Sequence, residues 1–369
     1  MKSLEPSPRK IHFSSLVTRL PGIIPGLLSL ESFQALENCI EDRQKNTGFF
    51  KFNEYKKDRA KLFGRFQGIF LKGYDNLRGV DRRFGKINIE ISNICNLQCT
   101  FCPEVIRSKK TMKLDAFEHI TKEIAPLTDQ VTYHLMGDPL VHSKLDAFLE
   151  ISARYNTPVF LVTNGTLLDA NRSKSLLHPI LRQVNFSLHS FPDNFPDRDP
   201  GTYLARIFEY VDRALLRRPD LYLNFRLWNL ESPTRFPEAN SRIREHIETH
   251  YKVKLPDRVD VRSKKSFRIR DRLYVHYDTE FVWPDPELPL LGETGTCHGL
   301  RNHFGILVDG TVVPCCLDKE GRIPLGNILE RPILEILESR KAKEILHGFL
   351  NRKLVDPLCQ RCNYVTRFS

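Results

Sequence analysis

Three cysteines lie close together in residues 94–102, which read Ile-Cys-Asn-Leu-Gln-Cys-Thr-Phe-Cys. Cys95, Cys99 and Cys102 have the spacing C-x3-C-x2-C. Three thiolates can bind a metal ion and leave one coordination position open for water or substrate, as catalytic zinc sites do. A 4Fe-4S cluster held by three thiolates would also keep one iron free for another ligand. The spacing leaves both sites open, together with unligated cysteines in a core.

The segment before these cysteines, residues 86–92, alternates apolar and polar side chains and is predicted to be a strand. The thiols therefore follow the carboxyl end of a strand, where parallel α/β folds place their chemistry. The same reasoning predicts five more strands, at residues 130–135, 158–163, 183–189, 222–228 and 257–263. Helices are predicted between them, at residues 115–124, 144–155, 171–177, 203–217 and 237–251.

Six strands alternating with helices indicate an α/β fold with a parallel sheet, either an open doubly wound sheet or a barrel. The cysteine motif, with the aromatic Phe101 before its third cysteine, resembles the signature of the radical S-adenosylmethionine (SAM) superfamily. That resemblance implies a partial (β/α)6 TIM-like barrel and a 4Fe-4S cluster on Cys95, Cys99 and Cys102. It also implies SAM on the open iron, and a 5′-deoxyadenosyl radical that abstracts hydrogen from a substrate.

Short polar motifs follow the second, third and fourth predicted strands. Residues 136–140, Met-Gly-Asp-Pro-Leu, resemble the family motif Gly-Gly-Glu-Pro, with Met136 for the first glycine and aspartate for glutamate. Residues 163–165, Thr-Asn-Gly, and a serine in residues 185–190, Asn-Phe-Ser-Leu-His-Ser, resemble two further SAM-binding segments. Each motif alone also suits an ordinary turn. The resemblance implies that SAM contacts Phe101, Gly137, Asp138, Pro139, Thr163, Asn164 and Ser187.

Two residues on the fourth and fifth predicted strands are candidate catalytic groups. His189 is either a hydrogen-bonded histidine at a strand end or a substrate contact or proton relay. Arg226 shares one strand face with Asn224 and Trp228, and an arginine that points into a barrel needs an anion. The carboxylate of SAM is one candidate, because relatives use an arginine on this strand for it. Otherwise Arg226 pairs with Glu90 or faces a helix.

A second set of cysteines occupies the end of the chain. Cys297 and Cys315 frame the pattern C-x12-G-x4-C, and Cys359 and Cys362 form C-x2-C. Between them lie a predicted hairpin at residues 307–313 and a predicted helix at residues 332–347. Residues 297–362 resemble the SPASM domain, or its shorter form Twitch, which implies one auxiliary 4Fe-4S cluster on these four thiolates. Zinc bound by four cysteines is the rival, and Cys316 could replace Cys315.

The whole chain has 369 residues, nine cysteines and a net charge of +11. It has no apolar run of the roughly 20 residues that a membrane span needs, and no secretory signal. Such cysteine usage without export indicates metal or redox chemistry in a reducing cytoplasm, with Cys39 as an ordinary buried residue. We expect three parts: a basic N-terminal extension of unknown role at 1–85, the barrel at 86–285 and the SPASM/Twitch domain at 286–369.

The sequence thus predicts a cytoplasmic radical SAM oxidoreductase or maturase. Its substrate is a peptide or a small molecule, and its electron donor is a flavodoxin or ferredoxin. An auxiliary cluster that accepts an electron would make the net reaction an oxidation. The alternative from another class is a zinc- or cluster-bearing protein that binds nucleic acid through its basic N-terminal region, without radical chemistry.

Overall fold

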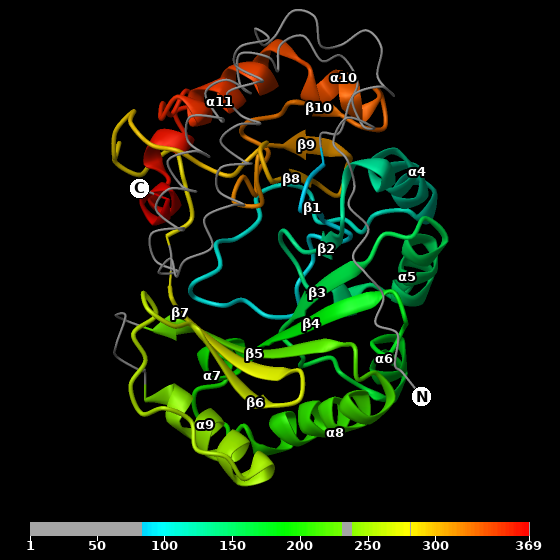
Figure 1. The fold of residues 1–369 in the computed structure, drawn as a ribbon, viewed down its shortest axis with the longest axis vertical. Coiled ribbons are helices and arrows are strands. Elements are labelled where there is room, and N and C mark those ends of the chain that lie inside the picture. The colour runs from blue at the N-terminus through cyan, green and yellow to red at the C-terminus, as the bar shows by residue number, and fades with distance from the viewer. Residues whose placement is uncertain (1–82, 231–237, 281, 369) are drawn as a thin grey trace, which may run out of the picture. The chain divides into compact units, whose positions relative to one another are not determined.

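The computed structural model describes residues 83–230, 238–280 and 282–368 (Figure 1). The predicted N-terminal extension, residues 1–85, falls almost entirely outside the described residues, and so does Cys39. Residues 81–369 form one compact unit.

One sheet of ten strands organises this unit, in the order β10-β9-β8-β1-β2-β3-β4-β5-β7-β6. Six neighbouring strands of this sheet are parallel to one another, and the sequence analysis predicted the first five of them. They are β1 (Lys86–Ile89), β2 (Val131–Tyr133), β3 (Val159–Thr163), β4 (Leu181–Ser187), β5 (Tyr222–Leu230) and β7 (Leu273–Thr279). The sheet curves around its inner face, and its edge strands do not pair with each other (Figure 1). The architecture is the partial barrel that the sequence predicts.

The prediction of the sixth strand was wrong. Residues 257–263 form loop and turn, and the sixth parallel strand is β7, which follows the antiparallel edge strand β6 (Ser266–Arg270). The alternation in 257–263 is real, because Val259 and Val261 are buried. These side chains anchor a loop to the core, so alternating burial occurs here without strand pairing.

Helices cover the outer face of the sheet, as Figure 1 shows for α4, α5, α6, α8 and α9. Their bounds follow the prediction closely, and they are α4 (Leu114–Ile124), α5 (Leu145–Arg154), α6 (Ala170–Ser175), α8 (Gly201–Arg217) and α9 (Ala239–Tyr251). In α8 the buried side chains recur every three to four residues and pack on the sheet, which is the arrangement of an amphipathic helix. A short helix that the sequence did not predict, α7 (Ser190–Asn194), directly follows β4.

The C-terminal segment joins the same sheet. Its first strand, β8 (His303–Ile306), runs parallel to β1, and β9 (Thr311–Val313) and β10 (Gly326–Asn327) extend the sheet in antiparallel fashion. The predicted hairpin is therefore β8–β9. The predicted helix at 332–347 is two helices, α10 (Ile333–Leu337) and α11 (Arg340–Leu350), because Ser339 caps the second by accepting a hydrogen bond from the amide of Ala342.

Candidate functional site

The three thiols of the C-x3-C-x2-C motif follow the carboxyl end of β1 in one loop. Burial, together with the nearby charges of Cys99 and Cys95, raises the pKa of the Cys102 thiol to about 12. The three sulfurs are thus electrostatic neighbours, as predicted. Three neighbouring thiols in one loop can bind a 4Fe-4S cluster and leave one iron without a protein ligand.

Helix α7 holds this loop from the β4 side. Asn194 accepts a hydrogen bond from the Gln98 amide (2.9 Å) and donates one to the Cys99 sulfur (3.1 Å). Asp193 accepts from both the amide (2.7 Å) and the hydroxyl (2.6 Å) of Thr100. The sequence analysis missed both residues. Their side chains fix the backbone on either side of Cys99 and direct an amide donor at its sulfur.

The loop is held on its other side by the ends of β2 and β3. The Asn164 side chain donates hydrogen bonds to Asn96 Oδ1 (3.0 Å) and, more distantly, to the Cys95 sulfur (3.8 Å). Gly137 has φ +74°, and a Cβ there would lie 2.4 Å from the carbonyl oxygen of Ser92. Glycine is thus required at this close approach, which also lets the Asp138 amide bond to the Ile94 carbonyl (3.0 Å).

Asp138 is hydrogen-bonded within the chain, and its predicted contact with SAM stays a prediction. Its carboxylate is buried and accepts hydrogen bonds from the Thr163 hydroxyl (2.9 Å), the Asn164 amide (2.7 Å) and the Leu140 amide (2.9 Å). The carboxylate therefore joins the ends of β2 and β3 and does not face the cavity described below. Four of the predicted SAM contacts are not among the residues that line this cavity, and they are Asp138, Pro139, Thr163 and Asn164.

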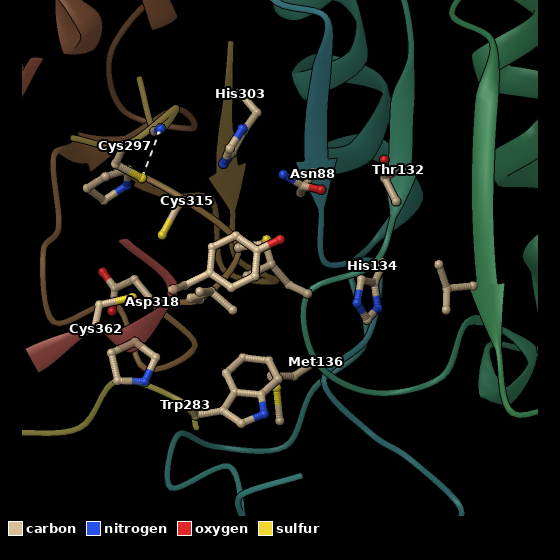
Figure 2. A pocket seen from close by; sticks show the side chains of 18 of the residues that line it. Asn88, Thr132, His134, Met136, Trp283, Cys297, His303, Cys315, Asp318 and Cys362 are labelled. Carbon is tan, nitrogen blue, oxygen red and sulfur yellow. Dashed lines mark hydrogen bonds between the residues drawn. The ribbon is translucent and has the colours of Figure 1, made fainter. Parts of the chain in front are cut away.

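A cavity of about 430 Å³ lies between the inner face of the sheet and the C-terminal segment. Four of the predicted SAM contacts line it, and they are Phe101, Gly137, Ser187 and Arg226. In Figure 2, Asn88, Thr132 and His134 lie on one side of the cavity, and Cys297, Cys315 and Cys362 lie on the other. Cys102 also lines it. One cavity thus connects the first thiol loop with the second set of cysteines.

The four cysteines predicted for the auxiliary site come together. Burial raises the pKa of each thiol, and the charge of Cys297 raises the values of Cys315, Cys359 and Cys362 further. The Cys297 sulfur accepts a hydrogen bond from the Gly299 amide (3.4 Å). All four line the cavity, so four thiols that are far apart in the sequence form one donor set that fits an iron–sulfur cluster.

Cys315 and Cys316 have different surroundings. The pKa of Cys315 is raised by burial and then by the charges of Cys316, Cys297 and Cys359. Cys316 packs against an apolar cluster of Leu135, Leu307 and Val313. Cys316 also lines the cavity and raises the pKa values of Cys297 and Cys362, so Cys315 as the ligand stays a prediction from the spacing.

The two candidate catalytic residues lie side by side at the cavity. The ring of His189 lies 4.9 Å from that of Phe101, and its Nδ1 lies 3.1 Å from the carbonyl oxygen of Arg226 and 3.4 Å from the Trp228 amide nitrogen. Burial lowers the pKa of His189 to about 4, so the ring is neutral at pH 7. The Arg226 guanidinium lies over the Trp228 ring, with Cζ 4.2 Å from the ring centroid.

The suggested pairing of Arg226 with Glu90 was wrong. Glu90 is fully buried and binds both terminal nitrogens of Arg107, at 2.8 and 3.0 Å, and it also accepts from the Val308 amide (3.0 Å). Arg107 follows the thiol loop, and its Nε donates to the carbonyl oxygen of Lys319 (2.8 Å). This ion pair ties β1, the thiol loop and the C-terminal segment together. The sequence does not show which charged residues are buried, so the Glu90–Arg107 ion pair could not be predicted from it.

Comparison with known families agrees with this geometry. A model of the radical SAM superfamily matches residues 89–223, and a model described as an iron–sulfur cluster-binding domain, SPASM, matches residues 297–363. The chain carries a radical SAM domain and a SPASM domain. The first domain implies a 4Fe-4S cluster with SAM and the second implies auxiliary iron–sulfur clusters, which favours iron–sulfur over zinc.

Individual relatives match only part of this radical SAM chain. A SAM-dependent 2-deoxy-scyllo-inosamine dehydrogenase of Niallia circulans is 27% identical over 26% of the chain, and a GTP 3′,8-cyclase of Chlorobaculum tepidum is 32% identical over 37% of it. The chain spans 42% of the length of each. The crystal structure of BtrN with AdoMet and 2-DOIA has the same fold, with a TM-score of 0.50, 16% identity, and coverage of 77% of this chain and 94% of BtrN.

The described part of this radical SAM chain also bears on two further predictions. None of its helices is long and apolar enough to cross a membrane. Its eight cysteines are all free of disulfides.

Proposed function

We propose that this chain cleaves SAM reductively and uses the resulting radical to oxidise a substrate held in the cavity between its two sets of thiols. The observation that carries the proposal is the shared cavity. Cys102 of the first loop and all four C-terminal cysteines line the same space of about 430 Å³. Substrate bound there would contact both redox sites.

The residues around the first loop fit a cluster with one open corner. The loop supplies three thiols, and side-chain amides of Asn194 and Asn164 point at two of them. Once bound, the cluster and SAM supply a 5′-deoxyadenosyl radical that takes a hydrogen atom from carbon. The chain's own residues position the loop, while Phe101, Gly137 and Ser187 line the space beside it where SAM would lie.

A net dehydrogenation removes one hydrogen atom, one electron and one proton from the substrate. The electron would leave through the four-thiol site, whose cysteines share the cavity with the substrate. The proton needs an acceptor, and the neutral ring of His189, which lines the cavity, can take it. With a pKa of about 4, imposed by burial, His189 would hold that proton only briefly.

The partial relatives are the evidence for the substrate class. The partial relatives include a dehydrogenase acting on 2-deoxy-scyllo-inosamine and cyclases acting on GTP, so small molecules are favoured over peptides. The dehydrogenase supports the oxidation. The reductant is a flavodoxin or ferredoxin of the cytoplasm, where the eight described cysteines, all free, would stay reduced.

Anaerobic reconstitution tests this function. With dithionite and SAM, the wild-type chain should bind about eight irons, two cubes of four, and form 5′-deoxyadenosine. Cys95→Ala should lose the product, because the open-corner site loses one of its three thiols. Cys359→Ala is the matched control, since it removes a thiol from the other site and should still cleave SAM. Equal 5′-deoxyadenosine formation by Cys95→Ala and the wild type would contradict the proposal.

A further inference from the structure

Arg226 is a cation with no partner in a cavity. It lines the cavity from β5, at the level of Ser187 on β4. Within the residues that the structure describes, the guanidinium has no hydrogen bond and no ion pair, and it lies over the face of Trp228. Its surroundings lower its pKa to about 10 by desolvation. A desolvated cation is costly to leave uncompensated, so this position favours an anion.

The nearby carboxylates cannot provide that anion. Glu90 is held by Arg107, and Asp138 by the Thr163 hydroxyl and two backbone amides. Asp318, on the cavity wall, accepts from the amides of Arg322 (2.7 Å) and Ile323 (2.8 Å). Glu280 also lines the cavity, but its side chain is exposed at the rim and makes no ion pair with Arg226.

The rings around Arg226 hold it in place without neutralising it. Trp228 packs under the guanidinium and donates from Nε1 to Nδ1 of His276 (2.8 Å), which fixes the indole on β5 against β7. A guanidinium stacked on an aromatic face keeps its edge free for two parallel hydrogen bonds to an anion. His276 and His189 are neutral at pH 7, since burial lowers the pKa of each to about 4. The positive charge therefore stays on Arg226.

We infer that Arg226, stacked on Trp228, binds an anionic group of the substrate, a carboxylate or a phosphate. The inference rests on the proposed function and adds the substrate's chemical class. The bound substrate would place its anion on the β5 side of the cavity and its reacting carbon between this point and the thiol loop.

SAM also has a carboxylate, and Arg226 pairs in register with Ser187, a predicted SAM contact, so the test below must separate the two ligands. A carboxylate that chelates the open iron must lie beside the first thiol loop.

The test uses the reconstituted, SAM-loaded enzyme and two probes, acetate and inorganic phosphate, titrated by calorimetry. We expect the wild type to bind at least one probe saturably, and Arg226→Gln to bind it about tenfold more weakly or worse. The stronger probe identifies the anion as a carboxylate or a phosphate. Arg272→Gln is the matched control, because Arg272 also stacks on an aromatic ring, that of Tyr222 (4.7 Å), outside the cavity lining, and it should bind like the wild type.

SAM affinity separates the two sources of the anion. Arg226→Gln should bind SAM within about twofold of the wild type, whereas a loss of tenfold or more would assign the guanidinium to the cofactor and overturn the inference. Absence of saturable probe binding by the wild type would overturn it as well. Arg226→Lys, which keeps the charge, should recover part of the probe binding and so distinguishes anion loss from misfolding. Failure of every variant to form 5′-deoxyadenosine would refute the proposed function without changing these titrations.

Discussion

The side-chain amide of Asn194 donates a hydrogen bond to the sulfur of Cys99 across 3.1 Å, although 95 residues separate the two in the sequence. Asn194 ends α7, the short helix that directly follows β4. The neighbouring Asp193 holds the Thr100 backbone, so the donor and the sulfur are fixed to the same frame. A donor held in this way favours negative charge on the sulfur.

Asn194→Ala should therefore make the first cluster harder to reduce. A hydrogen bond contributes about 1 kcal/mol, which corresponds to a reduction potential about 40 mV more negative for one electron. Potentiometric titration followed by electron paramagnetic resonance (EPR) measures this shift. Asn351→Ala is the control, because that side chain is exposed and bonds to the His347 carbonyl in the C-terminal segment. An unchanged potential in Asn194→Ala would refute a role for this hydrogen bond.

Gly137→Ala should unfold the loop around the first thiols. The added Cβ would lie 2.4 Å from the Ser92 carbonyl oxygen, in a backbone with φ +74°. Strain of this kind costs roughly 1–3 kcal/mol before the clash is counted. Thermal unfolding and bound iron should both fall. Gly292→Ala is the control, because Gly292 also has a positive φ but has open space around it. This variant should bind as much iron as the wild type.

Glu90→Gln should destabilise the junction between the barrel and the C-terminal segment. The change keeps the shape of the side chain but removes the charge that Arg107 needs, and breaking a buried pair costs about 3–5 kcal/mol. Denaturant unfolding measures the loss. Glu118→Gln breaks an exposed pair with Arg154 and should cost at most about 1 kcal/mol. Equal losses in both variants would contradict the structural role of Glu90.

His276 should make the protein less stable in acid. Burial first, and then the charges of Arg226 and Lys265, lower its pKa from 6.5 to about 4, against a raising effect of Asp278. Between these two values the unfolded chain binds more protons than the folded one, so stability falls as the pH drops from about 6.5 to about 4. Nuclear magnetic resonance titration should show this low pKa, and Arg226→Gln should raise it. A pKa near 6.5 in the folded wild type would contradict the burial.

The two adjacent cysteines should differ in function. Cys315→Ala should lose about half of the bound iron, because it opens the four-thiol site. Cys316→Ala should keep that iron and lose only about 1 kcal/mol of stability, from its packing on Leu135, Leu307 and Val313. Iron analysis distinguishes the two variants. Iron loss in Cys316→Ala alone would reassign the ligand.

Local patterns were enough to predict much of the fold and both thiol groups. Cysteine spacing and strand ends are local, so the loop at Cys95, Cys99 and Cys102 lies where the sequence placed it. The helix pattern of α8 also appears directly in its apolar spacing. The sixth strand was misplaced because residues 257–263 alternate in burial without a partner strand, and pairing is a tertiary property.

The side chains that hold the site together could not be predicted in this way. Asn194 with Cys99, and Glu90 with Arg107, join segments that meet only after folding. The motif around Asp138 likewise does not reveal that its carboxylate accepts a hydrogen bond from the Asn164 amide after β3. Motifs identify which strand ends carry chemistry, but the folded contacts decide which atoms remain available.

The most direct test of the account is the response of the first cluster to SAM, measured in the Cys359→Ala background where that cluster dominates the EPR spectrum. Adding SAM to the dithionite-reduced protein should shift the signal, because SAM takes the iron that Cys95, Cys99 and Cys102 leave open. An unchanged spectrum, with no 5′-deoxyadenosine formed, would show that this corner is closed and would contradict the account.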